Sequence, residues 1–244
     1  MRGTGMVFGL VLLFANGFCG AADETGDTTP AVSTYAPAEI LADQIRGGVR
    51  TIGRSVRAEK DYRTDTFRQN AATLAVMAMT LGMSDEPSDL KPATPALVKA
   101  AMEAVNATDY TTAKKAAGMI VDAMDTSDEA ALSEMRWRKV CDIAILMKKV
   151  PLVDTRMRRE LRKGKTEQAT VLAAIAQVAA HDTSLGTTPE EKAEWVRFSE
   201  MMRDRAAVLP GIVGDGDEDA LEEAQDLLTE SCDLCHEGFQ VTVE

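Results

Sequence analysis

Histidine and cysteine are both scarce in this chain. Among 244 residues there are two histidines, His181 and His236, and four cysteines. Cys19 falls in an N-terminal leader and two cysteines share one motif near the C-terminus, which leaves Cys141 without a partner. A disulfide framework needs several paired cysteines, and a structural zinc site usually needs four ligands. The composition therefore excludes a disulfide-stapled domain and argues against a zinc domain.

Long apolar runs and strand patterns are also missing. The apolar run at residues 6–14 is too short to span a bilayer, and no other stretch is a candidate span. From residue 38 onward there is no alternation of β-branched and polar residues, and Ala, Leu, Met, Glu, Lys and Arg dominate. We therefore expect an all-α protein with no membrane span.

The N-terminus has the pattern of an export signal. Arg2 precedes the apolar run, and the small residues 19–22 follow it just before two acids. This pattern predicts a signal peptide over residues 1–22 and a periplasmic or secreted protein. Residues 23–37 are polar and contain Thr, Pro and Gly, so we expect a disordered lead-in there.

Acidic side chains outnumber basic ones. The chain carries 39 Asp and Glu against 27 Lys and Arg, a formal net charge of −12 at pH 7. Such a surface repels nucleic acid and anionic membranes, and it suits a basic protein partner. We therefore expect no nucleic-acid partner.

Apolar residues recur at helical spacing along the rest of the chain. Pro151 is expected to kink one long helix, and residues 210–216 are expected to form a loop. The pattern predicts helices over about 38–59, 65–81, 94–105, 111–124, 126–163, 166–180, 188–202 and 219–238.

The two halves of the chain look like copies of one another. Residues 68–74 align with residues 166–172, and the apolar positions of the preceding helices align with them. Four helices per half, joined by short links, are typical of an up-down bundle, which holds cofactors in its core. The sequence therefore predicts two tandem four-helix bundles, over residues 38–126 and 127–244.

One motif near the C-terminus carries recognisable chemistry. Cys232-Asp233-Leu234-Cys235-His236 has the pattern C-x-x-C-H, the attachment signature of a c-type haem. Two thiols one helical turn apart can each add across a haem vinyl group, and the imidazole that follows can bind the iron. The alternatives are a zinc half-site and a thiol redox pair; the first lacks further ligands, and the second normally follows a strand. We expect one haem c, attached through both cysteines, with the histidine on the iron.

With this motif at the end of its last helix, the second half resembles the cytochrome c-prime family. The likeness covers about residues 132–240 and rests on residues 232–239, where an aromatic residue follows the motif. Most other c-type cytochromes carry the motif near their N-terminus. The resemblance implies that the second bundle holds the haem and that the first is a haemless copy. Two departures are Gln240, where the family has a basic residue, and the presence of two bundles in one chain.

The resemblance also implies an arginine early in the first bundle helix and, four residues later, the residue over the open face of the haem. Alignment places them at Arg136 and Val140. The alternative register, Arg138 and Asp142, would set a carboxylate against an apolar haem face, which is costly. A valine cannot ligate iron, so the first register implies a five-coordinate iron open to a small gas such as NO or CO.

Two methionines are rivals for a sixth iron ligand. Met135 and Met147 lie on the same expected helix, although a methionine on a helix face is more often core filler. A sixth ligand would imply a plain electron carrier.

These observations predict an exported cytochrome that is not an enzyme, working by electron transfer with a redox partner protein or by gas binding. The alternative is a haem-containing sensor or interaction module in which the paired bundles form a binding surface or a homodimer interface. A haem peroxidase would need a distal histidine and arginine pair, which the sequence does not show.

Overall fold

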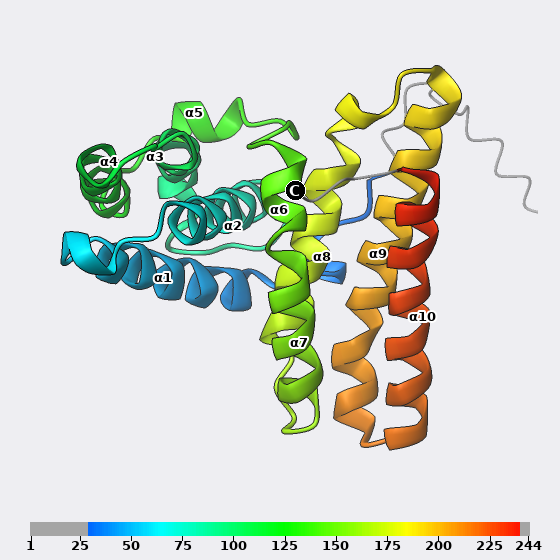
Figure 1. Ribbon diagram of the computed structural model, residues 1–244. Coiled ribbons are helices and arrows are strands. Elements are labelled where there is room, and N and C mark those ends of the chain that lie inside the picture. The colour runs from blue at the N-terminus through cyan, green and yellow to red at the C-terminus, as the bar shows by residue number, and fades with distance from the viewer. Residues whose placement is uncertain (1–28, 240–244) are drawn as a thin grey trace, which may run out of the picture. The chain divides into compact units, whose positions relative to one another are not determined.

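The computed structural model describes residues 29–239, and the regular elements among them are all helices (Figure 1). The expected all-α class is confirmed. Residues 31–239 belong to one compact unit. The expected signal peptide, residues 1–22, lies outside the described residues. None of the helices within residues 29–239 combines the length and the apolar character that crossing a membrane requires.

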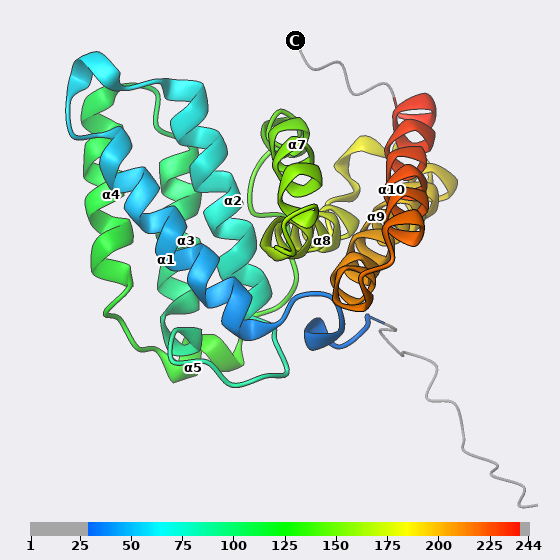
Figure 2. The ribbon, with the colours of Figure 1, turned by 90° about the horizontal axis from the view of Figure 1, so that it is seen from below.

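Four helices of the first half pack in a ring. They are α1 (Ala38–Ser55), α2 (Thr64–Gly82), α3 (Thr94–Val105) and α4 (Tyr110–Ala123). Each packs on the next, and α4 returns to pack on α1 (Figure 2). Asp109 starts α4 with a capping box, its carboxylate accepting from the backbone N–H of Thr112.

The lead-in is ordered from residue 31 onward, contrary to expectation. Val32–Thr34 forms a 3-10 helix, and the side chains of Val32, Tyr35 and Ala36 are buried. The Ser33 hydroxyl and backbone N–H both donate to the Asp85 carboxylate. The expected disorder is therefore wrong for this part, because three apolar side chains find a core that the local composition did not reveal.

The long helix expected over residues 126–163 is also wrong. The chain instead forms α5 (Glu129–Ser133), α6 (Ile143–Met147) and α7 (Val150–Leu161), with a non-helical stretch at residues 135–142. Pro151 does not kink a helix; it occupies the first turn of α7, where a proline is well tolerated.

Tertiary contacts hold the non-helical stretch in place. The Trp137 ring stacks on His181 at 5.3 Å between centroids, and Lys139 pairs with the buried Asp182 at 3.0 Å. Asp142 then caps α6 by accepting from the backbone N–H of Ala144. The partners of Trp137 and Lys139 are distant in sequence, so helical periodicity alone could not reveal these two contacts.

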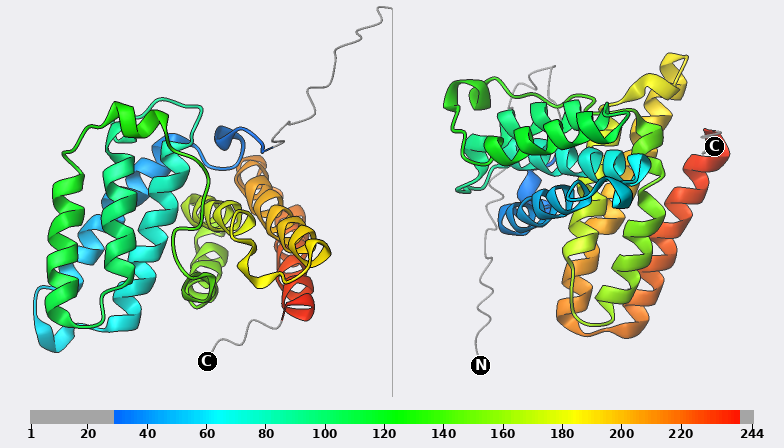
Figure 3. Two further views of the ribbon diagram at one scale, coloured as in Figure 1. Left: turned by 90° about the horizontal axis from the view of Figure 1, so that it is seen from above. Right: turned by 60° about the vertical axis from the view of Figure 1, so that its left-hand side comes forward.

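Three long helices complete the chain: α8 (Glu167–Ala180), α9 (Pro189–Asp215) and α10 (Glu218–Gly238). The expected loop at residues 210–216 is wrong, because α9 continues through Pro210 and ends at Gly216, whose positive φ of 71° suits glycine. Both views of Figure 3 show α9 and α10, in orange and red, side by side.

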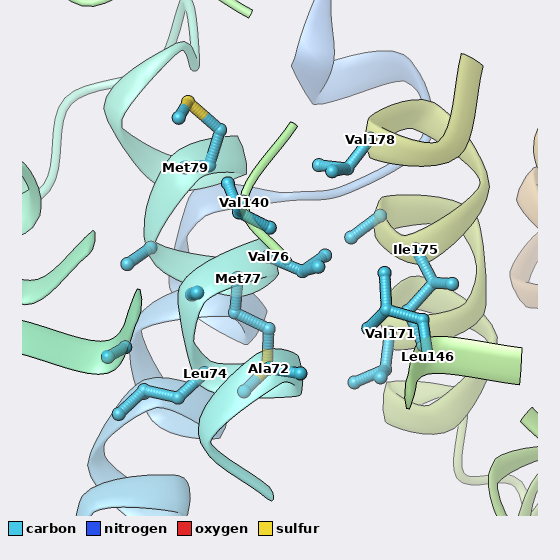
Figure 4. Packing of buried hydrophobic residues seen from close by; sticks show 14 of the residues in the cluster. Ala72, Leu74, Val76, Met77, Met79, Val140, Leu146, Val171, Ile175 and Val178 are labelled. Atoms are coloured by element: carbon cyan, nitrogen blue, oxygen red, sulfur yellow. The ribbon is translucent and has the colours of Figure 1, made fainter. Parts of the chain in front are cut away.

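Helices α2 and α8 are the most deeply buried elements, and they pack against one another. Figure 4 shows their apolar side chains meeting, with Val76 of α2 facing Val171 and Ile175 of α8. These are the two segments that align between the halves of the sequence. The two halves of the chain therefore share a buried interface.

Candidate cofactor site

In the first half, the first and last helices, α1 and α4, pack against each other. In the second half, the corresponding helices, α7 and α10, scarcely pack on one another, and we call the space between them the seam. Helix α7 packs on α8, α8 on α9, and α9 on α10, but α7 and α10 pack far less closely than α1 and α4 do. A cavity of about 70 Å³ lies in this seam. Its walls come from four parts of the chain. The lining residues are Met147, Val150, Pro151, Ala179, Trp195, Phe198, Ser199, Met202, Ser231, Cys232, Cys235 and His236.

The C-x-x-C-H motif forms the last turns of α10. Because residues three and four apart share a helix face, Cys232, Cys235 and His236 point to the same side. All three line the seam cavity, the cysteines from half-buried positions and His236 from an exposed one, whereas Asp233 and Leu234 lie outside the lining. The structure therefore brings together the three motif residues that the sequence selected.

Both cysteines are half-buried thiols outside any disulfide. Burial raises the pKa of Cys235 to about 11, with a smaller contribution from neighbouring Cys232. Burial also raises the pKa of Cys232, as do the carboxylates of Asp154 and Asp233. Redox-active thiols have lowered pKa values, often at a helix N-terminus. These thiols sit at a helix C-terminus and stay protonated at neutral pH, which disfavours the redox-pair alternative.

Aromatic rings form the wall opposite the motif. Trp195 is buried and its indole N–H donates to the backbone carbonyl of Ala179 at 2.8 Å. The Trp195 and Phe198 rings meet Phe239 edge to face, with centroids 5.3 and 6.4 Å apart. Trp195 and Phe198 therefore belong both to the hydrophobic core and to the lining of the seam cavity.

An arginine that the sequence did not single out for this site bridges the seam. The Arg158 guanidinium, on α7, pairs with Asp154 at 2.9 Å and donates to the Thr229 hydroxyl of α10 at 2.6 Å. Thr229 lies one helical turn before Cys232 on α10. Arg158 therefore links the two walls of the seam beside the motif.

The two residues assigned by resemblance lie elsewhere. Val140 is buried between α2 and α8, near Val76 and Val178, and does not line the seam cavity (Figure 4). Arg136 is exposed and donates to the backbone carbonyl of Met135 at 2.6 Å. That register assumed a continuous helix through residues 135–142, which the structure lacks, so the placement of both beside the motif is corrected.

The rival methionines are separated by the fold. Met135 packs against α2 and α3, where its sulfur accepts from the Thr94 hydroxyl at 3.5 Å. Met147 lines the seam cavity, as does Met202 of α9, which the sequence did not single out. Cys141 lies outside the lining, and burial raises its pKa to about 12.

No group of three or more His, Cys, Asp or Glu side chains within residues 29–239 is arranged to hold a metal ion. A scan of protein-family models, a search of curated proteins and a search of solved structures each found no match to this chain.

Proposed function

We propose that this protein is an exported c-type cytochrome that carries one haem in the seam between α7 and α10. Cys232 and Cys235 would hold the haem covalently, and His236 would bind its iron. One observation carries this proposal: all three side chains of a C-x-x-C-H motif line an apolar cavity between the helices of a four-helix group.

The residues present fit such a group chemically. The site offers two protonated thiols, an imidazole and a lining that is otherwise mostly apolar. The cavity of about 70 Å³ equals the liquid volume of only two or three waters, so the macrocycle must take space that side chains now fill. The sparse packing between α7 and α10 allows that space to open.

A haem bound here supplies a one-electron couple. The chain's own contribution is to exclude water and to fix the iron ligand. Trp195 and Phe198 provide a dry wall, and burial together with the axial ligand sets the potential. Nothing in the proposal requires a substrate to be converted, so we propose a carrier rather than an enzyme.

The thioethers of Met147 and Met202 favour electron transfer over gas binding. Both line the cavity that the motif faces, whereas Val140, on which the open-face expectation rested, lies outside it. A thioether on the iron would give a six-coordinate electron carrier. Reversible binding of NO or CO is the alternative if neither sulfur reaches the iron.

The closed four-helix ring of the first half and the four long helices of the second half support a tandem-bundle origin. The α1–α4 ring closes through α1 and α4. When the last helices of the two halves are aligned by sequence, Met124, Ser127 and Asp128 stand where the second half has Cys232, Cys235 and His236. We propose that the first half is the haemless copy, whose α2 supports α8 at the base of the haem site.

Acidic side chains surround the motif on the outer face of α10. Asp226, Glu230, Asp233 and Glu237 are exposed there beside Leu234. Charge complementarity steers association, so a basic redox partner suits this face.

Coexpression with c-haem maturation machinery tests the proposal. The native protein should carry one covalent haem, detected by mass and by haem-stained denaturing gels. The double variant Cys232→Ala/Cys235→Ala should lose it, while the control Cys141→Ala should keep it. Covalent haem that survives in the double variant, or that never forms in the native chain, would overturn the assignment.

Spectra of the reduced protein with and without CO then distinguish the two modes of action. A low-spin spectrum that ignores CO supports a thioether ligand, and Met147→Ala or Met202→Ala should convert it to a CO-binding form. A native spectrum that shifts on CO addition supports gas binding instead. His236→Ala should retain covalent haem and change its spin state in either case.

A further inference from the structure

A second cavity lies on the opposite face of α7, where the two halves of the chain meet. It has a volume of about 290 Å³ and is bounded by α1, α2, α7 and α8. Four of its lining side chains are cationic and none is acidic, although the chain as a whole is acidic. The lining residues are Gln44, Gly47, Gly48, Arg50, Thr51, Arg54, Asn70, Thr73, Met77, Lys149, Val153, Arg156, Gln168 and Val171.

Lys149 forms the buried base of this cationic cavity. Its exposed fraction is 8%, and its ammonium donates to the amide oxygen of Asn70 at 2.8 Å. It forms no ion pair with any residue from 29 to 239. Burial, and then the neighbouring Arg156, lower its pKa. Burying an ammonium beside only a neutral partner is costly, because no negative charge compensates it. A bound anion would supply that charge.

Three arginines form the rim. Arg50 and Arg54 project from α1 and Arg156 from α7, and all three are exposed. None of them pairs with a carboxylate within the described part of the chain. The Arg54 guanidinium donates instead to the Thr51 hydroxyl at 3.1 Å. Like charges gathered around one cavity repel each other unless an anion lies between them.

Two glycines without side chains leave space in the cationic cavity, and neutral polar side chains add hydrogen-bonding groups to its wall. Gly47 and Gly48 face it from α1, and a Cβ on Gly48 would meet Leu74 Cδ1 at 3.4 Å. The side chains of Thr51 and Thr73 add hydroxyl groups to the wall.

We propose that this cationic cavity binds a small, multiply charged anion of the phosphate or polycarboxylate class. Its volume is at the lower end of small-molecule sites, and arginine forks with a lysine are the residues that proteins use for such anions. Because the cavity draws on α1 and α2 as well as α7 and α8, the bound anion ties the two halves together. The cationic cavity and the haem seam occupy different faces of α7, so neither proposal depends on the other.

Calorimetric titration of the full mature chain at constant ionic strength tests the site, with pyrophosphate and citrate as probes. We expect saturable binding of one anion per chain. Arg156→Gln should raise the Kd at least tenfold, because each charge-assisted hydrogen bond contributes this much. Arg159→Gln removes an exposed charge from the same helix outside the cavity and should leave the Kd within twofold. Tighter pyrophosphate binding assigns a phosphate ligand, and tighter citrate binding a polycarboxylate.

The variant Lys149→Met distinguishes a loss of anion binding from a loss of folding. The thioether has a similar length without the buried charge, so the variant should melt a few degrees higher than the native chain without anion, while losing both titrations. Absence of saturable binding in the native chain would overturn the proposal. Equal losses in Arg156→Gln and Arg159→Gln would also overturn it, since they would indicate diffuse attraction to net charge. Neither outcome bears on haem attachment.

Discussion

The thiols of Cys232 and Cys235 show what a side chain's surroundings add to a motif. C-x-x-C alone fits either a redox pair or an attachment point. Here burial raises the pKa of both thiols, and the C-terminal end of α10 disfavours their ionised form. Both thiols are therefore protonated at neutral pH in the haem-free protein.

Alkylation of the haem-free protein checks this interpretation. The variant Cys141→Ala leaves Cys232 and Cys235 to react with iodoacetamide. Because only the thiolate reacts and the pKa of Cys235 is about 11, its modification rate should still be rising above pH 10. The urea-unfolded protein, with ordinary thiols, is the control and should level off earlier. A rate for the folded protein that levels off below pH 8 would contradict the prediction.

The buried ammonium of Lys149 should make the free energy of unfolding depend on pH. Its pKa in the folded protein is below the ordinary 10.5, so between the two values the unfolded chain binds more protons. The contribution of Lys149 to the free energy of unfolding therefore rises with pH between its folded pKa and 10.5. Below the folded pKa, the full cost of burying the charged side chain is present. Without anion, Lys149→Met should be more stable than the native chain by about 1 kcal/mol at pH 7, and the difference should shrink toward pH 10.5. Urea unfolding at several pH values measures it; a constant difference would contradict the prediction.

At the scale of a helix, two prolines have opposite roles. Pro151 lies in the first turn of α7, where its missing N–H costs nothing, and Pro210 lies inside α9. From the sequence alone, each proline is expected to interrupt a helix, by a kink at Pro151 and by a loop from Pro210. Helix α9 continues past Pro210, with Leu209 buried before the proline and Ile212 and Val213 packed against the core after it.

Substituting each proline by alanine separates these roles. Pro210→Ala should stabilise the protein by about 2 kcal/mol, since it restores a backbone hydrogen bond. Pro151→Ala should destabilise it by about 0.5 kcal/mol, because the unfolded chain gains freedom and the helix gains no bond. Urea denaturation of the haem-free protein measures both. Equal effects of the same sign would show that Pro210 is not within a continuous helix.

At the scale of the whole molecule, the buried α2–α8 interface joins both halves of the sequence. Independent bundles would each keep a polar outer face on these helices. Instead, α2 is buried from Ala71 to Gly82, and α8 from Ala169 to Ala180. The halves are therefore expected to unfold together.

Ile175→Ala tests that coupling. Its side chain is fully buried at the interface, so the variant should lose about 2–5 kcal/mol. Far-ultraviolet dichroism and tryptophan fluorescence should still report a single coincident transition. Val121→Ala, at a half-exposed position, is the control and should change stability by under about 0.5 kcal/mol. Two separated transitions would mean that the halves fold independently.

The sequence by itself determined the helical class, most helix positions and the three motif residues on one face of α10. These follow from local spacing: apolar periodicity specifies a helix, and C-x-x-C-H puts two thiols and an imidazole on one side of it. The start of α9 after Thr188 is likewise a local signal, since Thr-Pro-Glu-Glu places a proline and two acids in the first turn.

Only the tertiary structure decided what faces the motif. Residues 135–142 are non-helical because Trp137 and Lys139 find partners about forty residues away, at His181 and Asp182, and this change moves Val140 away from the seam. The same break brings Met147 to the motif and sets Lys149 among the arginines of α1 and α7. Such placements depend on long-range packing, which local periodicity does not encode.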